Sequence, residues 1–242
     1  MADSPTLQTK IIHIHIPKTA GTAIRAAFEK AAATREMISP HLEEDNYRES
    51  ITPGNRYFSG HIGHETAMRI GGEIVVVLRS PIERLVSLYF FWRQLYAQQK
   101  DTSLKCEMAS RFSLIEFFSI TDEPILLEPF KDHVMWQLAH GSTIRHKREL
   151  RKQGMTDDQV MRLALDNLSA YAVVGIQENM ESFVASVRKR LGLNLAIQKI
   201  NVTKAKVESL TYQELLAIEK HVTFDQYIYS HAVRIAGDHA HR

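Results

Sequence analysis

The fold class of this chain is decided by the segment Lys10-Ile-Ile-His-Ile-His-Ile-Pro-Lys-Thr-Ala-Gly-Thr22. Its first half, Lys10–Ile16, is rich in β-branched residues and apolar at every second position, which predicts a strand with His13 and His15 on the other face. Its second half is a turn of small residues. The turn leads into apolar residues at helical spacing (Ile24, Ala27, Phe28 and Ala31). A strand that passes directly into a helix predicts an α/β fold.

The rest of the chain continues this alternation of strands and helices. Further strands are expected at Arg56–Gly60, Glu73–Leu78 and Tyr171–Ile176, and Glu73–Leu78 has the continuous apolar character of a parallel strand covered on both faces. Helices are expected after Ser80, where Ile82, Leu85, Val86, Tyr89, Trp92 and Tyr96 share one face, and before Gly192. Four helix starts carry the capping-box pattern: Ser80/Glu83, Ser113/Glu116, Thr156/Gln159 and Thr211/Glu214. We therefore predict a three-layer fold with a mostly parallel central sheet flanked by helices.

Composition and charge limit the class of protein. The 242 residues are 44% hydrophobic and 24% charged, which is typical of a globular chain, and we expect one domain over residues 10–236 between short tails, 1–9 and 237–242. Lys and Arg exceed Asp and Glu by only two, so net charge gives no support for nucleic-acid binding. The single cysteine, Cys106, excludes an intrachain disulfide, and no apolar segment resembles a signal peptide or a membrane span. We expect a cytoplasmic protein without a membrane partner.

The turn after the first predicted strand is a candidate phosphate site. In an open α/β sheet, ligands bind at the carboxyl ends of the strands. The small residues Ala20 and Gly21 let the backbone approach an anion, the next helix points its N–H groups at it, and Lys18, Thr19 and Thr22 add a charge and hydroxyl donors. The motif is not a Walker A loop, because Lys18 precedes Gly21 instead of following it. An ordinary turn with a solvated Lys18 remains the alternative.

A second candidate anion site follows the predicted strand Glu73–Leu78. Arg79 stands at the carboxyl end of that strand, where its planar guanidinium can hold a phosphate through two N–H groups. Ser87 lies about two helical turns further on, on the same face as Ser80 and Arg84, so Arg79 and Ser87 can share one phosphate. The alternative is a strand-end charge beside a capping serine.

A histidine is the natural candidate for a general base, because its ordinary pKa lies close to neutral pH. The best placed is His61, just past the predicted strand Arg56–Gly60; His64 is a second choice, and Glu65 is a candidate to orient either ring. His13 and His15 could act as two metal ligands, but the sequence shows no third, so we predict no metal. His239 and His241 are expected to be inert.

These motifs resemble those of a known family. His15–Thr22 is similar to the 5′-phosphosulfate motif of sulfotransferases that use 3′-phosphoadenosine-5′-phosphosulfate (PAPS), and Leu78–Ser87 is similar to their 3′-phosphate motif. The resemblance is to the carbohydrate branch, the heparan/dermatan 2-O-sulfotransferase-like group and its bacterial relatives, with weaker similarity at Tyr171–Leu193 and Asn201–Lys204. It implies a P-loop-like fold in which Lys18, Thr19, Ala20, Gly21 and Thr22 bind the 5′ end of the donor and Arg79 and Ser87 its 3′-phosphate. Thr203 and Lys204 would help to close over the nucleotide, and the Gly60-His61 pair resembles the step that carries the family's base.

The resulting prediction is a PAPS-dependent sulfotransferase that acts on an acceptor hydroxyl, with a saccharide favoured. His61 is the predicted base, and Lys18 offsets the charge that grows on the leaving phosphate. PAPS is the only co-substrate expected. The basic stretch Arg145–Lys152 and several aromatic residues are candidates for acceptor contacts, but Lys131–Gly141 has Trp136 or Gln137 where the family carries an arginine, which leaves the acceptor open. The alternatives are a Mg²⁺-dependent kinase and a non-catalytic nucleotide- or glycan-binding relative; the sequence assigns no oligomeric state.

Overall fold

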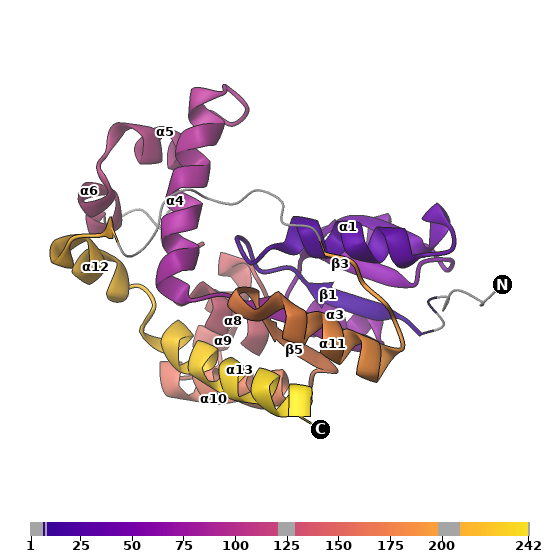
Figure 1. Cartoon of the computed structure of the whole chain (residues 1–242). Coiled ribbons are helices and arrows are strands. Elements are labelled where there is room, and N and C mark those ends of the chain that lie inside the picture. Colours follow the sequence, from indigo (N-terminus) through magenta and orange to yellow (C-terminus); the bar gives the residue numbers. More distant parts are fainter. Residues whose placement is uncertain (1–6, 8, 121–128, 198–208, 242) are drawn as a thin grey trace.

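The structure, a computed structural model, describes residue 7 and residues 9–120, 129–197 and 209–241 (Figure 1). Its centre is a parallel sheet of five strands in the order β2-β3-β1-β4-β5. The strands are β1 (Ile11–Ile14), β2 (Ile38–Glu43), β3 (Tyr57–His61), β4 (Glu73–Leu78) and β5 (Val173–Ile176). The predicted α/β fold with a parallel sheet is confirmed.

One strand, β2, was absent from the sequence prediction. Its sequence contains Pro40, which cannot donate a ladder hydrogen bond, and its pairing with β3 is interrupted between Ile38 and His41. Proline is tolerated on an edge strand, and β2 lies at the edge of the sheet. The strand is therefore defined by its partner β3 more than by its own alternation.

Helices connect the strands and cover both faces of the sheet. They are α1 (Gly21–Ala31), α2 (Tyr47–Ser50), α3 (His64–Ile70), α4 (Pro81–Ala97), α5 (Leu104–Arg111), α6 (Leu114–Ser119), α8 (His133–Ala139), α9 (Ile144–Lys152), α10 (Asp157–Ala170), α11 (Met180–Leu191), α12 (Tyr212–Glu219) and α13 (Thr223–His241), with short 3₁₀ turns η1 (Arg35–Met37) and η2 (Gln177–Asn179). None of the described helices is long and apolar enough to cross a membrane. α13 runs on through Gly237, where a tail was expected, and Leu7 in the expected N-terminal tail is buried.

Three of the four predicted capping boxes are present and one is not. Ser113, Thr156 and Thr211 each accept a hydrogen bond from the backbone N–H three residues on, and the side chain there returns it. At α4 the prediction was wrong: the Ser80 side chain makes no cap, because Glu83 instead accepts two hydrogen bonds from Arg79. The predicted end of α11 at Gly192 is confirmed, with this glycine in the left-handed region at φ 69°.

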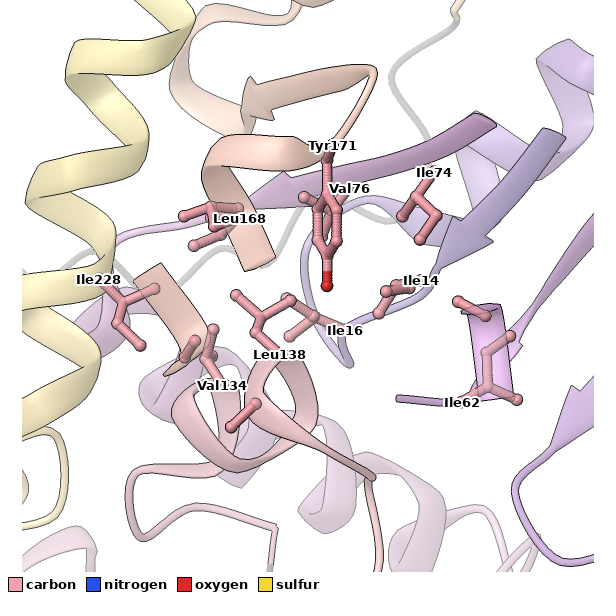
Figure 2. Packing of buried hydrophobic residues seen from close by; sticks show 14 of the residues in the cluster. Ile14, Ile16, Ile62, Ile74, Val76, Val134, Leu138, Leu168, Tyr171 and Ile228 are labelled. Carbon is pink, nitrogen blue, oxygen red and sulfur yellow. The ribbon is translucent and has the colours of Figure 1, made fainter. Parts of the chain in front are cut away.

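Two apolar cores sandwich the sheet. On one face, Ile11, Val75 and Val77 of the strands pack with Ile24 and Phe28 of α1 and with buried residues of α11. On the other face the strands contact α3, α8, α10 and α13, and Figure 2 shows Ile14 and Val76 of the sheet in the same cluster as Leu138 of α8 and Ile228 of α13. Because β1 is buried on both sides, it is held rigidly at the centre of the molecule.

A third apolar cluster lies outside the sheet sandwich. It joins α4 to α5, α6 and α12, which gather beside α4 away from the sheet (Figure 1). Tyr89 and Trp92, two of the residues predicted to share one helical face after Ser80, are buried in this cluster with Phe117. Cys106 is fully buried there as well, and burial raises the pKa of its thiol, so this cysteine acts as a small apolar residue. We call this group the α4 cluster.

The order of the strands marks where a ligand site is expected. β1 leads through α1 to β2 on one side of the sheet, whereas β4 leads through α4 towards β5 on the other side. β1 and β4 are neighbours, so their connections diverge in opposite directions at the carboxyl edge between them. Open α/β sheets bind ligands at such a point. The segments that begin there are Pro17–Ala20 and Arg79–Ser80.

Candidate functional site

The backbone between β1 and α1 forms a concave set of N–H groups. Lys18 and Ala20 have left-handed backbone angles, φ 72° and φ 63°, whereas Thr19 between them does not. Such alternation turns successive N–H groups to the same side, which creates an anion-binding nest. A left-handed conformation costs a non-glycine residue roughly 1–2 kcal/mol, so the surrounding structure must hold it in place. α1 follows with no acidic residue in its first turn and no side-chain cap at Ala20, which leaves its N-terminal N–H groups suited to an anion.

The side chains of this turn divide into structural and exposed groups. Thr19 is buried, and its hydroxyl donates a 2.8 Å hydrogen bond to the carbonyl of Ile16, so it holds the turn closed. Gly21 lies against the ring of His15: a Cβ on Gly21 would come within 2.0 Å of the imidazole. Thr22 is exposed on the first turn of α1. Of the two hydroxyls predicted for the phosphate, Thr22 is therefore the one open to a ligand.

Lys18 and Arg79 bring the two predicted motifs together. Burial lowers the pKa of Lys18 to about 8, and the positive charge of Arg79 contributes to this shift. The Lys18 ammonium lies 3.8 Å from the ring centroid of Phe91 on α4, a contact that stabilises a cation. Two cations from adjacent strand ends thus repel each other across the edge between β1 and β4, and an anion bound between them would remove that repulsion.

The second motif is anchored by two carboxylates. Glu83 accepts hydrogen bonds from the Nε and Nη2 atoms of Arg79 at 3.1 and 3.0 Å. The N–H of Ser80 donates to Glu178, which follows β5, at 2.9 Å. Ser87 lies two turns further along α4 and is buried. Arg79 therefore stands at the site edge with its guanidinium plane fixed, whereas Ser87 is enclosed in the interface of α4.

His61 ends β3, the strand beside β1, and meets a carboxylate. Its Nδ1 lies 3.3 Å from Oε1 of Glu43, and the ring is 38% exposed. The pKa of Glu43 is lowered chiefly by its hydrogen bond with His61. A carboxylate at Nδ1 holds the imidazole in the tautomer whose Nε2 lone pair is free to take a proton. Glu65, the sequence candidate to orient either His61 or His64, pairs with Arg69 and His140, and the carboxylate at His61 is that of Glu43.

His64, the second candidate, is used elsewhere. His61 belongs to a strand and His64 opens α3, so the two do not share a helical face. The ring of His64 stacks on Tyr171, and its Nδ1 lies 3.1 Å from the tyrosine hydroxyl. Burial lowers the pKa of His64. His64 thus links α3 to the segment before β5, and its ring contacts Tyr171.

Three histidine rings converge at the same edge of the sheet. The ring of His15 lies 4.9 Å from that of His61, and the ring of His41 on β2 lies 4.7 Å from it. Burial lowers the pKa of His15 to about 2, and it also lowers that of His41. His13 stacks behind His15 and is fully buried, with its Nδ1 near the hydroxyls of Tyr57 and Ser59. Spacing along the chain suggested His13 and His15 as a pair; the structure groups His15 with His41 and His61 instead.

Two buried polar residues that sequence reasoning did not assign hold these loops together. Glu44 accepts hydrogen bonds from the N–H of Gly63, the hydroxyl of Thr66 and the N–H of Ser142. The Ser142 hydroxyl also lies 2.8 Å from the carbonyl oxygen of His61. Gln137 on α8 donates to the carbonyls of Ile62 and His15 at 2.9 and 3.3 Å. Both residues fix the strand ends that carry the histidines, and nothing in their sequence context distinguishes them from ordinary polar residues.

Some of the predicted acceptor contacts are engaged by other residues, and others lie outside the described residues. The basic stretch forms α9, where Arg145 pairs with Asp45 and Arg151 lies over the ring of Trp136. Trp136 itself is buried. Thr203 and Lys204, expected to close over a nucleotide, lie outside the described residues. The exposed side chains at the ends of β2 and β3 are His41, Glu43 and His61, and Arg145 of α9 pairs with Asp45 just beyond β2.

Comparison with known families gives one result that covers most of the chain. The model described as "Sulfotransferase family" matches residues 6–223. The matched range contains the β1–α1 turn, Arg79 and the three converging histidines. A search of curated proteins gives no match.

Proposed function

Because the chain belongs to the sulfotransferase family, we propose that it transfers a sulfuryl group from PAPS to an acceptor hydroxyl, with His61 as the general base and Lys18 stabilising the leaving phosphate. The observation that carries this proposal is that Lys18 and Arg79 follow the neighbouring strands β1 and β4, with the Lys18 ammonium 3.8 Å from the Phe91 ring of α4, the helix that begins after Arg79. Two cations from two strand ends, beside a nest of backbone N–H groups, form a binding surface for a ligand with two phosphate groups.

The donor site divides between the two segments. The 5′ end of PAPS binds the nest of Lys18, Thr19 and Ala20 and the first turn of α1 at Gly21 and Thr22. The 3′-phosphate binds Arg79, whose guanidinium is held in one plane by Glu83, and Ser87 further along α4. Ser87 is buried, so a direct hydrogen bond from its hydroxyl to the 3′-phosphate requires a local movement of α4.

The transfer step assigns one task to each of two side chains. His61 Nε2 takes the proton of the acceptor hydroxyl while the acceptor oxygen forms a bond to sulfur. The bond between sulfur and the bridging phosphate oxygen breaks, and its electron pair goes to that oxygen, which leaves as part of 3′-phosphoadenosine 5′-phosphate (PAP). Lys18 offsets the negative charge that develops on the bridging oxygen, and its partial burial strengthens that interaction.

The acceptor binds at the ends of β2 and β3, beside His41 and His61. His61 and His41 are 38% and 37% exposed and Glu43 is 55% exposed, so this edge is open to a hydroxyl-bearing molecule. A saccharide is the first class to test, because the motifs resemble the carbohydrate branch of the family. Polar contacts at this edge come from imidazole and carboxylate groups, which hydrogen-bond to sugar hydroxyls.

The donor site is tested by thermal shift. PAP is titrated against the wild type, with AMP and with ATP plus Mg²⁺ for comparison, since a ligand that binds only the folded state raises the melting temperature. We expect PAP to raise the melting temperature of the wild type. In Arg79→Ala, the apparent affinity for PAP should fall at least about tenfold, because a charge-assisted contact is lost. Arg111→Ala on α5 is the matched control, because Arg111 is exposed and pairs only with Glu107 among the described residues.

The base is tested by turnover with a saccharide panel. His61→Asn is expected to lower kcat by about 10²–10⁴-fold, the usual contribution of a general base, and to leave PAP affinity unchanged. Stabilisation by ATP and Mg²⁺ alone would refute the proposal in favour of a kinase. PAP binding with no turnover in the wild type or in His61→Asn would favour a non-catalytic nucleotide-binding relative.

A further inference from the structure

Three imidazoles meet at the carboxyl edge of β2, β3 and β1. One ring nitrogen from each of His15, His41 and His61 lies within 4.8 Å of the others. The residues are far apart in sequence, and each belongs to a different strand or strand end. No other group of three or more metal-ligating side chains with this geometry occurs in the part of the chain that the structure describes.

The spacing of these nitrogens is close to that of a metal site. In a tetrahedral zinc site the Zn–N distance is about 2.0–2.1 Å, which places two ligand nitrogens about 3.4 Å apart. The separation of at most 4.8 Å is therefore closed by movements of about 1.4 Å or less. His41 and His61 are more than a third exposed, so these two rings can make the movement, whereas His15 is held by stacking on His13.

The surroundings of the three rings supply an outer partner for the ligand histidines. Glu43 lies 3.3 Å from Nδ1 of His61 and 3.5 Å from Nε2 of His41. A carboxylate beside a ligand histidine fixes its tautomer and raises its basicity, as the outer partners of zinc histidines do. Two positive charges act on this group: Arg25, whose guanidinium is occupied by Glu29 and by the carbonyls of Ser39 and Ser59, and Lys105, which acts on Glu43. Glu43 is the carboxylate that contacts two of the rings.

We propose that His15, His41 and His61 bind a divalent transition-metal ion of the zinc class, with Glu43 as its outer partner. Three neutral nitrogen ligands with an open fourth position suit zinc, cobalt, nickel or copper, and not magnesium or calcium, which prefer oxygen. The sequence led us to expect no metal, because only His15 of the pair it suggested belongs to this group; His41 and His61 come from β2 and β3.

One consequence rests on the proposed function. His61 is both the proposed base and a proposed ligand. A bound ion therefore prevents the His61 ring from taking the proton of the acceptor hydroxyl. Zinc then inhibits sulfuryl transfer by binding His15, His41 and His61, and it does not occupy the donor site. Binding of the ion itself does not depend on this consequence, and the two are measured separately.

The experiment uses the full chain with any histidine tag removed and metal stripped by a chelator. Zinc binding is measured by isothermal titration calorimetry, and Co²⁺ replaces zinc as a spectroscopic probe of nitrogen coordination. We expect one ion per chain. His41→Ala and His61→Ala are each expected to weaken affinity by at least about 100-fold, and Glu43→Gln by about tenfold, as for loss of an outer partner.

Matched controls separate this site from other histidines. His231→Ala removes a ring on α13 that contacts Ser169, and the double variant His239→Ala/His241→Ala removes the pair near the C-terminus; both are expected to bind zinc as the wild type does. The proposal is overturned if wild type and His41→Ala bind zinc equally, or if affinity is lost only in the C-terminal variant. PAP titrations of metal-free protein report on the donor site independently.

Discussion

Replacing Glu44 by alanine tests how the loops after β2 and β3 are held together. The carboxylate is buried and accepts hydrogen bonds from the N–H groups of Gly63 and Ser142, at 2.6 and 3.0 Å, and from the hydroxyl of Thr66. At about 1.5 kcal/mol for each hydrogen bond to a charged group, their loss amounts to about 4–5 kcal/mol of unfolding free energy. For a chain of this length, that corresponds to a fall in Tm of about 8–20 °C.

The assay is urea unfolding followed by far-UV circular dichroism, with a thermal scan alongside. Glu44→Gln retains one oxygen acceptor and is expected to lose about half as much as Glu44→Ala. Glu49→Ala on α2 is the matched control: Glu49 is exposed, so its replacement should change stability by no more than about 0.5 kcal/mol. A loss below about 1 kcal/mol in Glu44→Ala would refute the view that this carboxylate holds the loops after β2 and β3 together.

Three further predictions concern the donor edge and the core. Because the pKa of Lys18 is lowered to about 8 and only the protonated form attracts an anion, PAP affinity should fall as pH rises through about 8, and Lys18→Met should remove this dependence in titrations across that range. Gly21→Ala places a Cβ within 2.0 Å of the His15 ring, so we expect a stability loss of about 1–3 kcal/mol and weaker PAP binding by thermal shift. Asp225→Asn removes the ion-pair partner of the fully buried Arg84 and should cost about 3 kcal/mol in chemical unfolding, because the buried guanidinium then has only the more weakly placed Asp132 beside it among the described acidic groups.

Each of these predictions has its own control. PAP affinity that is constant across pH 7–9 in the wild type would contradict the role given to Lys18. Gly237→Ala adds a Cβ that meets nothing within 4 Å, so PAP binding should stay unchanged; an equal effect in both glycine variants would argue against the His15 contact. Arg84→Met combined with Asp225→Asn should recover much of the loss, since removing both charges of a buried pair is often close to neutral.

The sequence predicted those parts of the fold that depend on local pattern. β4 was predicted with its observed bounds, because Glu73–Leu78 carries an apolar run long enough to be read without its neighbours. β2 was not, because Pro40 interrupts its alternation and its position depends on pairing with β3. The capping box at Ser80 failed for a similar reason: Glu83 has a stronger partner in Arg79, and a motif of four residues does not reveal such competition.

In the candidate site too, local patterns could be read from the sequence, whereas contacts between distant segments could not. Lys18 and Arg79 stand in contiguous motifs at the ends of two strands, so spacing was enough to single them out. The partner of His61 is Glu43 and not Glu65, which is nearer in sequence, because the strand order brings the end of β2 beside β3. The group of His15, His41 and His61 draws on three strands. Only the pairing of the sheet brings these rings together, and no linear spacing predicts it.

The central position of β1 also has a consequence for how the chain reaches its native state. All four residues of β1 are buried, and its partners are β3 and β4. These partners are distant in sequence: His13 of β1 contacts Tyr57 of β3, 44 residues further along the chain. Pairing over such separations must close long loops before any contact repays the entropy, which makes folding slow. During synthesis β1 emerges before β3 and β4 and remains unpaired until both partners follow. The strand that leads into the nest in the native protein is therefore exposed to aggregation in the nascent one.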